Sequence, residues 1–205
     1  MAVPAPRVLS YSELRKIADA FSQKHWPSGA IPVDVEFIVD VEFGLDIVAV
    51  PHLHAGYGID GFLAADRTTI YIDQAVQDHS LLYRYRFTLA HELAHYHLHG
   101  ALFEDAAFDS VDTWRRFLNH MPEKSRSWYE WQGYAFAGLL LVPRDALVEK
   151  IEDAVDLARQ SSFQDLDLDV EAHRDMVAEW VGRRFEVSAE VIVRRGVYDG
   201  HWEAK

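Results

Sequence analysis

The chain has 205 residues, 49% of them hydrophobic and 26% charged, a profile typical of a folded domain rather than a disordered or fibrous protein. Its formal net charge of -13 opposes binding to a nucleic-acid backbone, and the lack of cysteine excludes disulfides and thiolate metal sites. The longest apolar run, residues 135–142, is too short to span a bilayer, and the N-terminus lacks a signal-peptide pattern. We therefore expect a cytoplasmic protein with no membrane partner and no direct nucleic-acid partner.

The first half of the chain predicts two helices followed by a small sheet. Apolar side chains recur at helical spacing after Ser10, a candidate N-cap, and Gly29 and Gly44 supply helix stops. The expected elements are helices over 10–26 and 33–43, a strand over 46–50, and a hairpin formed by 62–64 and 69–72.

The second half predicts mainly helices. A histidine-rich helix is expected to end at Gly100, and Pro143 ends the apolar helix that follows, because proline cannot continue a helix. The expected elements are helices over 80–98, 127–142 and 144–160, an acidic and aromatic segment over 103–127, a polar linker over 161–169, and two closing helices on either side of 185–188, with Ser188 as the second N-cap.

The two closing helices meet at a tight turn, which is also typical of helix-turn-helix DNA-binding motifs. The acidic net charge argues against that interpretation. The basic pairs Arg183–Arg184 and Arg194–Arg195 are short, and we expect them on solvated helix faces. Packing onto the core is the favoured interpretation, and a DNA-binding regulator is a weaker alternative.

The sequence His91-Glu92-Leu93-Ala94-His95 has the pattern H-E-x-x-H. Residues four apart on a helix are rotated by only about 40° from each other, so both imidazoles leave one face at the separation that a zinc ion needs. Glu92 lies about 100° round the helix from His91, beside such an ion, where it would act as a general base.

A zinc ion held by two histidines needs a third protein ligand. A metzincin would place a histidine at position 101, which is alanine in this chain. His97 points away from His95 on a helical wheel. His99 lies on the same face but about 12 Å along the axis from His91, too far to share the ion. We expect His99 to lie behind the ligands or to face substrate.

Glu130 is the candidate third ligand. It belongs to an apolar helix that we expect to pack antiparallel to the histidine helix and to bring one carboxylate to the ion. Two histidines and one glutamate leave the fourth position open, which is typical of catalytic zinc. The alternative is that Glu130 is a solvated residue in the first turn of its helix, where carboxylates are favoured in any case.

The stretches RFTLAHELAHYHLH and EWQGYAFAGLLLVP together resemble the ImmA/IrrE family of zinc metallopeptidases. The resemblance covers roughly residues 30–195. It implies that His91, His95 and Glu130 bind Zn2+ and that Glu92 is the general base.

The resemblance also implies a fold and a biological role. The fold is α+β, a gluzincin-like core in which a small twisted sheet packs on two ligand-bearing helices, followed by C-terminal helices. We expect one metallopeptidase domain over 1–205, with a catalytic core over 30–143 and a helical extension over 144–205. Family members typically cleave a helix-turn-helix repressor or antitoxin in the cytoplasm and so relieve repression of phage, mobile-element, toxin-antitoxin or stress-response genes.

The sequence departs from the family pattern at two neighbouring positions. Gly133 replaces an alanine, and Tyr134 replaces an Asn or Asp that accepts a hydrogen bond from a ligand histidine. The Tyr134 hydroxyl, Asp109 or Asp112 are candidate substitutes for this acceptor. If none serves, metal affinity falls, since such partners are worth roughly 10 to 100-fold. The alternative function is then a weak or inactive family member that regulates a partner protein by binding.

The group that would stabilise the oxyanion is not fixed by any motif. The candidates are His99, His120 and Tyr134.

Overall fold

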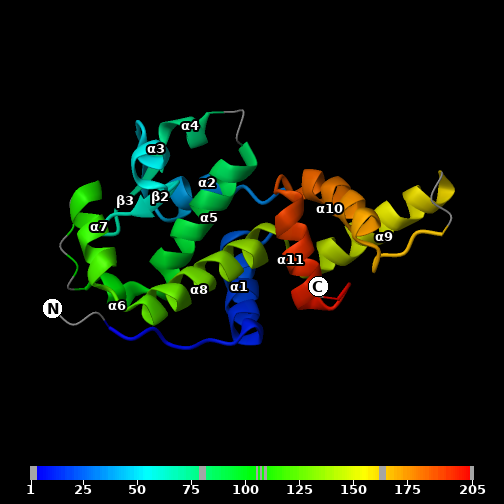
Figure 1. The fold of residues 1–205 in the computed structure, drawn as a ribbon, viewed down its shortest axis with the longest axis horizontal. Helices are drawn as coiled ribbons and strands as arrows, with labels where there is room; N and C mark the ends of the chain where they lie inside the picture. Colours follow the sequence, from blue (N-terminus) through cyan, green and yellow to red (C-terminus); the bar gives the residue numbers. More distant parts are fainter. Residues whose placement is uncertain are drawn as a thin grey trace.

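The computed structural model describes residues 4–78, 82–104, 106, 108, 110–161 and 165–203. Its architecture is α+β, as expected, with a three-stranded sheet, a central helix pair and further helices at the C-terminal end (Figure 1). In chain order the elements are α1 (Tyr11–His25), α2 (Val35–Phe37), the π-helix η1 (Ile38–Glu42), β1 (Asp46–Val50), α3 (Leu53–Tyr57), β2 (Gly61–Leu63), β3 (Thr69–Asp73), α4 (Gln74–Gln77), α5 (Leu82–Leu98), α6 (Gly100–Phe103), α7 (Val111–His120), α8 (Glu123–Leu141), α9 (Arg144–Gln160), α10 (Glu171–Phe185) and α11 (Ala189–Asp199).

The first helices follow local signals in the sequence. Ser10 caps α1 by accepting the amide N–H of Glu13, whose carboxylate accepts the Ser10 amide N–H at 2.8 Å. Gly44 has a left-handed φ of 63°, which ends η1 and turns the chain into β1. The expected helix over 33–43 is only partly right, because one α-helical turn at Val35–Phe37 gives way to the π-helix.

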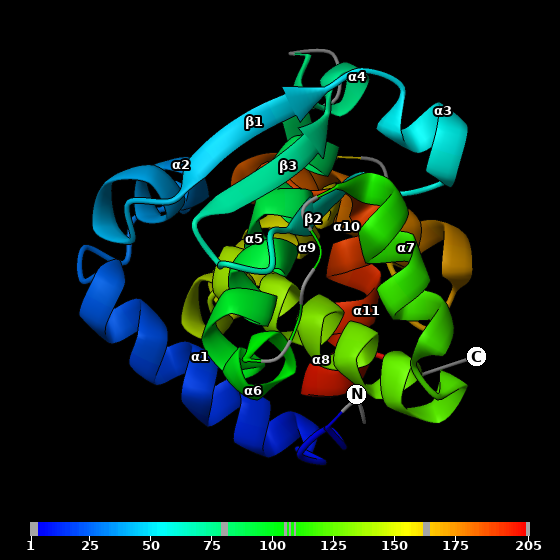
Figure 2. The same ribbon diagram turned by 90° about the vertical axis from the view of Figure 1, so that its left-hand side faces the viewer.

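The sheet lies against α5, and Figure 2 shows its strands above that helix. The strand order is β1-β3-β2; β1 runs parallel to β3, and β2 pairs antiparallel with β3, which confirms the predicted hairpin. Ile70 and Ile72 of β3 are fully buried, since alternate residues of a strand share one face. This packing sets β2 beside the middle of the histidine helix.

The centre of the molecule is an antiparallel pair formed by α5 and α8. Phe87, early in α5, stacks against Tyr134 in the second half of α8, whereas His99, just after α5, contacts Tyr129 earlier in α8. The expected antiparallel packing is therefore confirmed. Helix α1 packs against α8 as well (Figure 1).

The middle of the chain corrects several sequence predictions. The histidine helix ends at Leu98, as predicted, but Gly100 opens α6 instead of stopping α5; the predicted start near Ser80 lies outside the described residues. The segment over 103–127 contains α7, which the sequence reading missed. Helix α8 begins at Glu123 rather than at 127, so Glu130 lies in its interior and not in its first turn.

The closing helices carry mixed charges on their outer faces. Arg183 pairs with Glu179, and Arg194 pairs with Glu190, both at a spacing of four residues. Alternating signs of this kind favour a solvated helix face over a nucleic-acid surface. Among the described residues, no helix is long and apolar enough to cross a membrane.

A buried charge cluster joins α11 to α8 and α1. Arg195 donates to the carbonyl of Gly138 at 2.7 Å and to the Asp199 carboxylate at 2.8 Å, and Arg15 pairs with the same carboxylate. The Asp199 side chain is completely buried, and Arg195 is only 3% exposed. The expectation that Arg195 lies on a solvated face is therefore wrong.

We expect Asp199→Ala to lower the free energy of unfolding by about 3 kcal/mol, because it leaves two arginines without their shared buried counter-charge. The measurement is urea denaturation followed by circular dichroism. Glu190→Ala on the same helix removes an exposed pair and should cost less than about 1 kcal/mol. Equal losses in the two variants would contradict the structural role of the cluster.

Candidate metal centre

Three potential metal ligands converge where α5 faces α8. One ligand atom from each of His91, His95 and Glu130 lies within 4.8 Å of the others. The Nε2 atoms of the two histidines are 3.1 Å apart, and the Glu130 carboxylate is 3.3 Å from Nε2 of His91 and 3.9 Å from Nε2 of His95. The structure therefore brings together the three ligands proposed from the sequence.

Gly133 allows the two helices to approach closely at this point. A Cβ atom at position 133 would lie 2.8 Å from Cε1 of His91 and 3.1 Å from Nε2 of His95. Contacts this short would displace the imidazole rings. Glycine in place of the family's alanine therefore leaves room for the two imidazole rings in the positions that they adopt in this chain.

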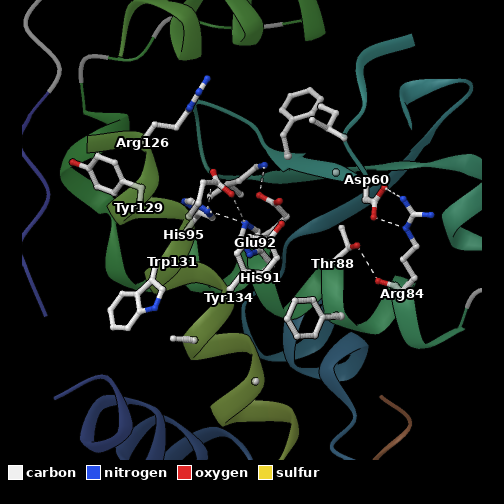
Figure 3. Close-up of a pocket in the computed structure, with 18 of the residues that line it drawn as sticks. Asp60, Arg84, Thr88, His91, Glu92, His95, Arg126, Tyr129, Trp131 and Tyr134 are labelled. Carbon is white, nitrogen blue, oxygen red and sulfur yellow. Dashed lines mark hydrogen bonds and ion pairs between the residues drawn. The ribbon is translucent and has the colours of Figure 1, made fainter. Parts of the chain in front are cut away.

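Glu92 lies beside the ligands with its carboxylate directed at the sheet (Figure 3). It is 7% exposed and accepts the backbone N–H of Leu63 in β2 at 2.9 Å. Burial raises the pKa of Glu92 to about 7, against the lowering effect of His91 and the Leu63 amide. A carboxylate with a pKa near neutrality is suited to taking and returning a proton.

The ligands themselves have unequal proton affinities. Burial raises the pKa of Glu130, but the hydrogen bond to His91 and the neighbouring histidine charges outweigh it and bring the pKa down to about 2. Burial lowers the pKa of His91, but the carboxylates of Glu130 and Glu92 reverse this and raise it. For His95, burial and the charge of His91 keep the pKa well below its usual value. A proton therefore competes with a metal mainly at His91.

His99 lies behind His95 and not beside the ligand atoms. Its Nδ1 is 3.1 Å from Nδ1 of His95, and its Nε2 is 3.1 Å from Oε1 of Gln132. His97 points away, as expected, with its ring against Phe21 and Phe136. Sequence reasoning missed Gln132, although a glutamine inside an otherwise apolar helix was a signal that could have found it.

Tyr134 contacts His91 through its ring. The centroids of the two rings are 4.6 Å apart, and Tyr134 is 51% exposed. Nδ1 of His91 is buried and has no hydrogen-bond partner among the residues that the structure describes. Of the other acceptors considered, Asp112 accepts the Tyr57 hydroxyl at 3.4 Å instead, and position 109 lies outside the described residues.

The oxyanion candidates are placed differently. Tyr134 lines the cleft above the ligands, whereas His99 is behind them. His120 is directed at the carbonyl of Arg116, 2.5 Å away, at the end of α7. His120 is therefore not brought to the site.

We expect Tyr134→Asn to tighten zinc binding by up to about tenfold, since the amide oxygen would give Nδ1 of His91 an acceptor where the described residues supply none. Affinity would be measured by competition with a chromophoric chelator. Tyr134→Phe keeps the ring and supplies no acceptor, so its affinity should equal that of the wild type. If both variants bind equally, the missing acceptor does not limit affinity.

A cleft of about 1370 Å³ opens over these residues. His91, Glu92, His95 and Glu130 lie in its wall, and the pair formed by Asp60 and Arg84 lines it as well (Figure 3). Its lining is mainly apolar and includes aromatic side chains from β2, α7, α8 and α11: Phe62, Trp114, Phe117, Trp131, Tyr134 and Tyr198. The cleft is large enough for several residues of an extended peptide.

The donor set fits a divalent metal, because two imidazole nitrogens and a carboxylate converge on one point that faces the cleft. With a buried glutamate next to these donors, the fold and the site are of the metallopeptidase type. A comparison with protein families matches residues 65–196 to the IrrE N-terminal-like domain, a peptidase family. The chain belongs to this family, which confirms the resemblance seen in its motifs. None of the curated proteins compared with the chain matches it.

Proposed function

We propose that this protein is a cytoplasmic zinc endopeptidase that cleaves a helix-turn-helix repressor or antitoxin and so relieves repression in a phage, mobile-element, toxin-antitoxin or stress-response setting. The observation that carries the proposal is the buried carboxylate of Glu92 next to the His91, His95 and Glu130 donors at the wall of a peptide-sized cleft. Family membership supports peptidase chemistry in general. The substrate class rests on the family resemblance and on charge.

Each residue of the site has a defined task in this proposal. When bound by His91, His95 and Glu130, zinc would polarise the scissile carbonyl and make water a stronger nucleophile. Glu92 takes the proton of the attacking water and passes it to the leaving amine. The backbone N–H of Leu63 holds the Glu92 carboxylate in place. The mainly apolar lining of the cleft favours peptides with apolar side chains near the cut.

The charge of the protein supports a basic partner. With a net charge of -13, the molecule attracts proteins whose surfaces are adapted to nucleic acid. A helix-turn-helix regulator has such a surface. The attraction should weaken as ionic strength rises.

The direct test incubates the zinc-loaded protein with helix-turn-helix regulators encoded next to its gene and maps any cut by mass spectrometry. Cleavage at one position, lost on chelation and restored by zinc, is the expected result. An intact regulator that nevertheless binds tightly would overturn the endopeptidase proposal.

A second function, regulation by binding without cleavage, is favoured by one observation. Nδ1 of His91 lacks a partner among the described residues, so one ligand ring is held less firmly than the other. A protein with this defect would keep the fold and the cleft but bind metal weakly. Stoichiometric binding of a regulator at equal affinity with and without zinc would identify this function.

A further inference from the structure

A chain of hydrogen bonds leads from the ligand His95 to the N-terminal segment of the protein. Nδ1 of His95 meets Nδ1 of His99 at 3.1 Å, and Nε2 of His99 meets Oε1 of Gln132 at 3.1 Å. The side-chain amide of Gln132 then donates to the backbone carbonyl of Arg7 at 2.6 Å. His95, His99 and Gln132 are all buried, the last at 1% exposure, so bulk water does not compete for the two bonds that join them.

The carbonyl of Arg7 fixes the direction of every bond in this chain. A carbonyl oxygen only accepts, so Gln132 must turn its NH2 group to Arg7 and its oxygen to His99. His99 therefore carries its proton on Nε2 and accepts through Nδ1. The partner of that Nδ1 must then donate, which places a proton on Nδ1 of His95.

This tautomer determines the state of the other ring nitrogen of His95, Nε2. A neutral imidazole with its proton on Nδ1 has a bare lone pair on Nε2, and Nε2 is the atom that faces His91 and Glu130. Only a bare nitrogen binds a metal. His91 has no comparable chain, because its Nδ1 has no partner among the described residues.

We propose that Gln132 and His99 are positioning residues that hold His95 in its metal-binding tautomer, with the Arg7 carbonyl as the fixed end of the chain. A second contact keeps that end in place, since the Tyr129 hydroxyl donates to the carbonyl of Pro4 at 3.0 Å. Figure 1 shows the N-terminal segment running below α6 and α8 before it enters α1, and the two contacts above join it to α8. This inference rests on the proposed metal site but does not depend on the substrate or on cleavage.

The first test is the tautomeric state of the wild-type histidines, read from 15N chemical shifts and long-range 1H–15N correlations on both the metal-free and the zinc-loaded protein. The expected result is a proton on Nδ1 of His95 and on Nε2 of His99. The opposite tautomer at either ring would overturn the proposal. This measurement needs no variant and no substrate.

The second test compares two substitutions of Gln132. Gln132→Met keeps the approximate shape but removes the acceptor, so we expect a mixed tautomer at His99 and zinc binding weakened by about tenfold or more. Gln132→Glu keeps an acceptor towards His99 and should keep the proton on Nε2 of His99, although a carboxylate cannot donate to the Arg7 carbonyl. Unchanged tautomer and affinity in Gln132→Met, with the fold intact by circular dichroism, would overturn the proposal.

Two controls distinguish the loss of this hydrogen-bond chain from a general disturbance of the fold. Arg7→Ala leaves the backbone carbonyl in place and should match the wild type, because the exposed Arg7 side chain takes no part. His97→Phe alters a histidine on the same helix that faces Phe21 instead, and it should leave zinc affinity unchanged. Absence of any cleaved regulator would count against the proposed function alone. The tautomers and zinc affinities would still test whether Gln132 and His99 hold His95 in its metal-binding tautomer.

Discussion

We expect Glu92→Gln to retain about one zinc ion per chain and to lower peptide cleavage by a factor of about 10² to 10⁴. Glutamine has nearly the same shape and can still accept the N–H of Leu63, so the site keeps its geometry. It cannot take a proton from water, so the general base is lost. Metal content by mass spectrometry and the rate of regulator cleavage are the two measurements.

The matched control is Glu179→Gln. Glu179 pairs with Arg183 on the exposed face of α10 and does not line the cleft that holds the ligands. Its cleavage rate should stay close to that of the wild type. Cleavage by Glu92→Gln at the rate of this control would refute the role of Glu92 as general base.

The rate of cleavage should fall in acid because Glu92 acts as a carboxylate. Burial raises the pKa of Glu92 to about 7 in the metal-free site, so the base is progressively lost by protonation below that pH. A bound cation favours the ionised form and moves the acid limb of the profile to lower pH. A profile of kcat/KM against pH, recorded with zinc in excess, should show this limb. A rate independent of pH between 4 and 7 would contradict it.

Purified wild-type protein should contain about one zinc ion per chain, and Glu130→Ala should lose it or bind it much more weakly. Glu130 supplies the only carboxylate of the three-residue donor group found among the described residues. Two histidines alone form an incomplete site. Zinc content after dialysis and the dissociation constant from chelator competition both measure the loss.

Glu123→Ala is the control on the same helix, since Glu123 is exposed in the first turn of α8. It should bind zinc as the wild type does. No zinc in the wild type, even after zinc is added back, would mean that the site binds metal too weakly, as expected if Nδ1 of His91 has no acceptor beyond the described residues either. Regulation by binding would then become the leading function.

The sequence was most informative where the physical cause was local. Histidines four apart on a helix must share a face, the capping residues of α1 lie three apart, and the hairpin followed from two short apolar stretches. Those features can be predicted without knowing how the rest of the chain folds.

The sequence was less informative where the cause was tertiary. Arg195 looked like a surface residue because the carbonyl of Gly138 that it contacts belongs to α8, and because its buried counter-charge, Asp199, is shared with Arg15 of α1. Gln132 gained its role only when α5, α8 and the N-terminal segment came together. Helix α7 was missed although Trp114, Phe117 and Leu118 are spaced as on one helix face, because the segment was judged by its acidic and aromatic composition.

The buried carboxylate of Glu92 also couples metal binding to the stability of the folded protein. Ionising a carboxylate in the interior costs free energy, and the raised pKa of Glu92 is a measure of that cost. A cation that binds only the folded chain offsets the cost and adds its own binding energy to stability. In the proposed function, a cell short of zinc would therefore hold a peptidase that is inactive and also more open to degradation, so that metal supply would set both how well the enzyme works and how long it lasts.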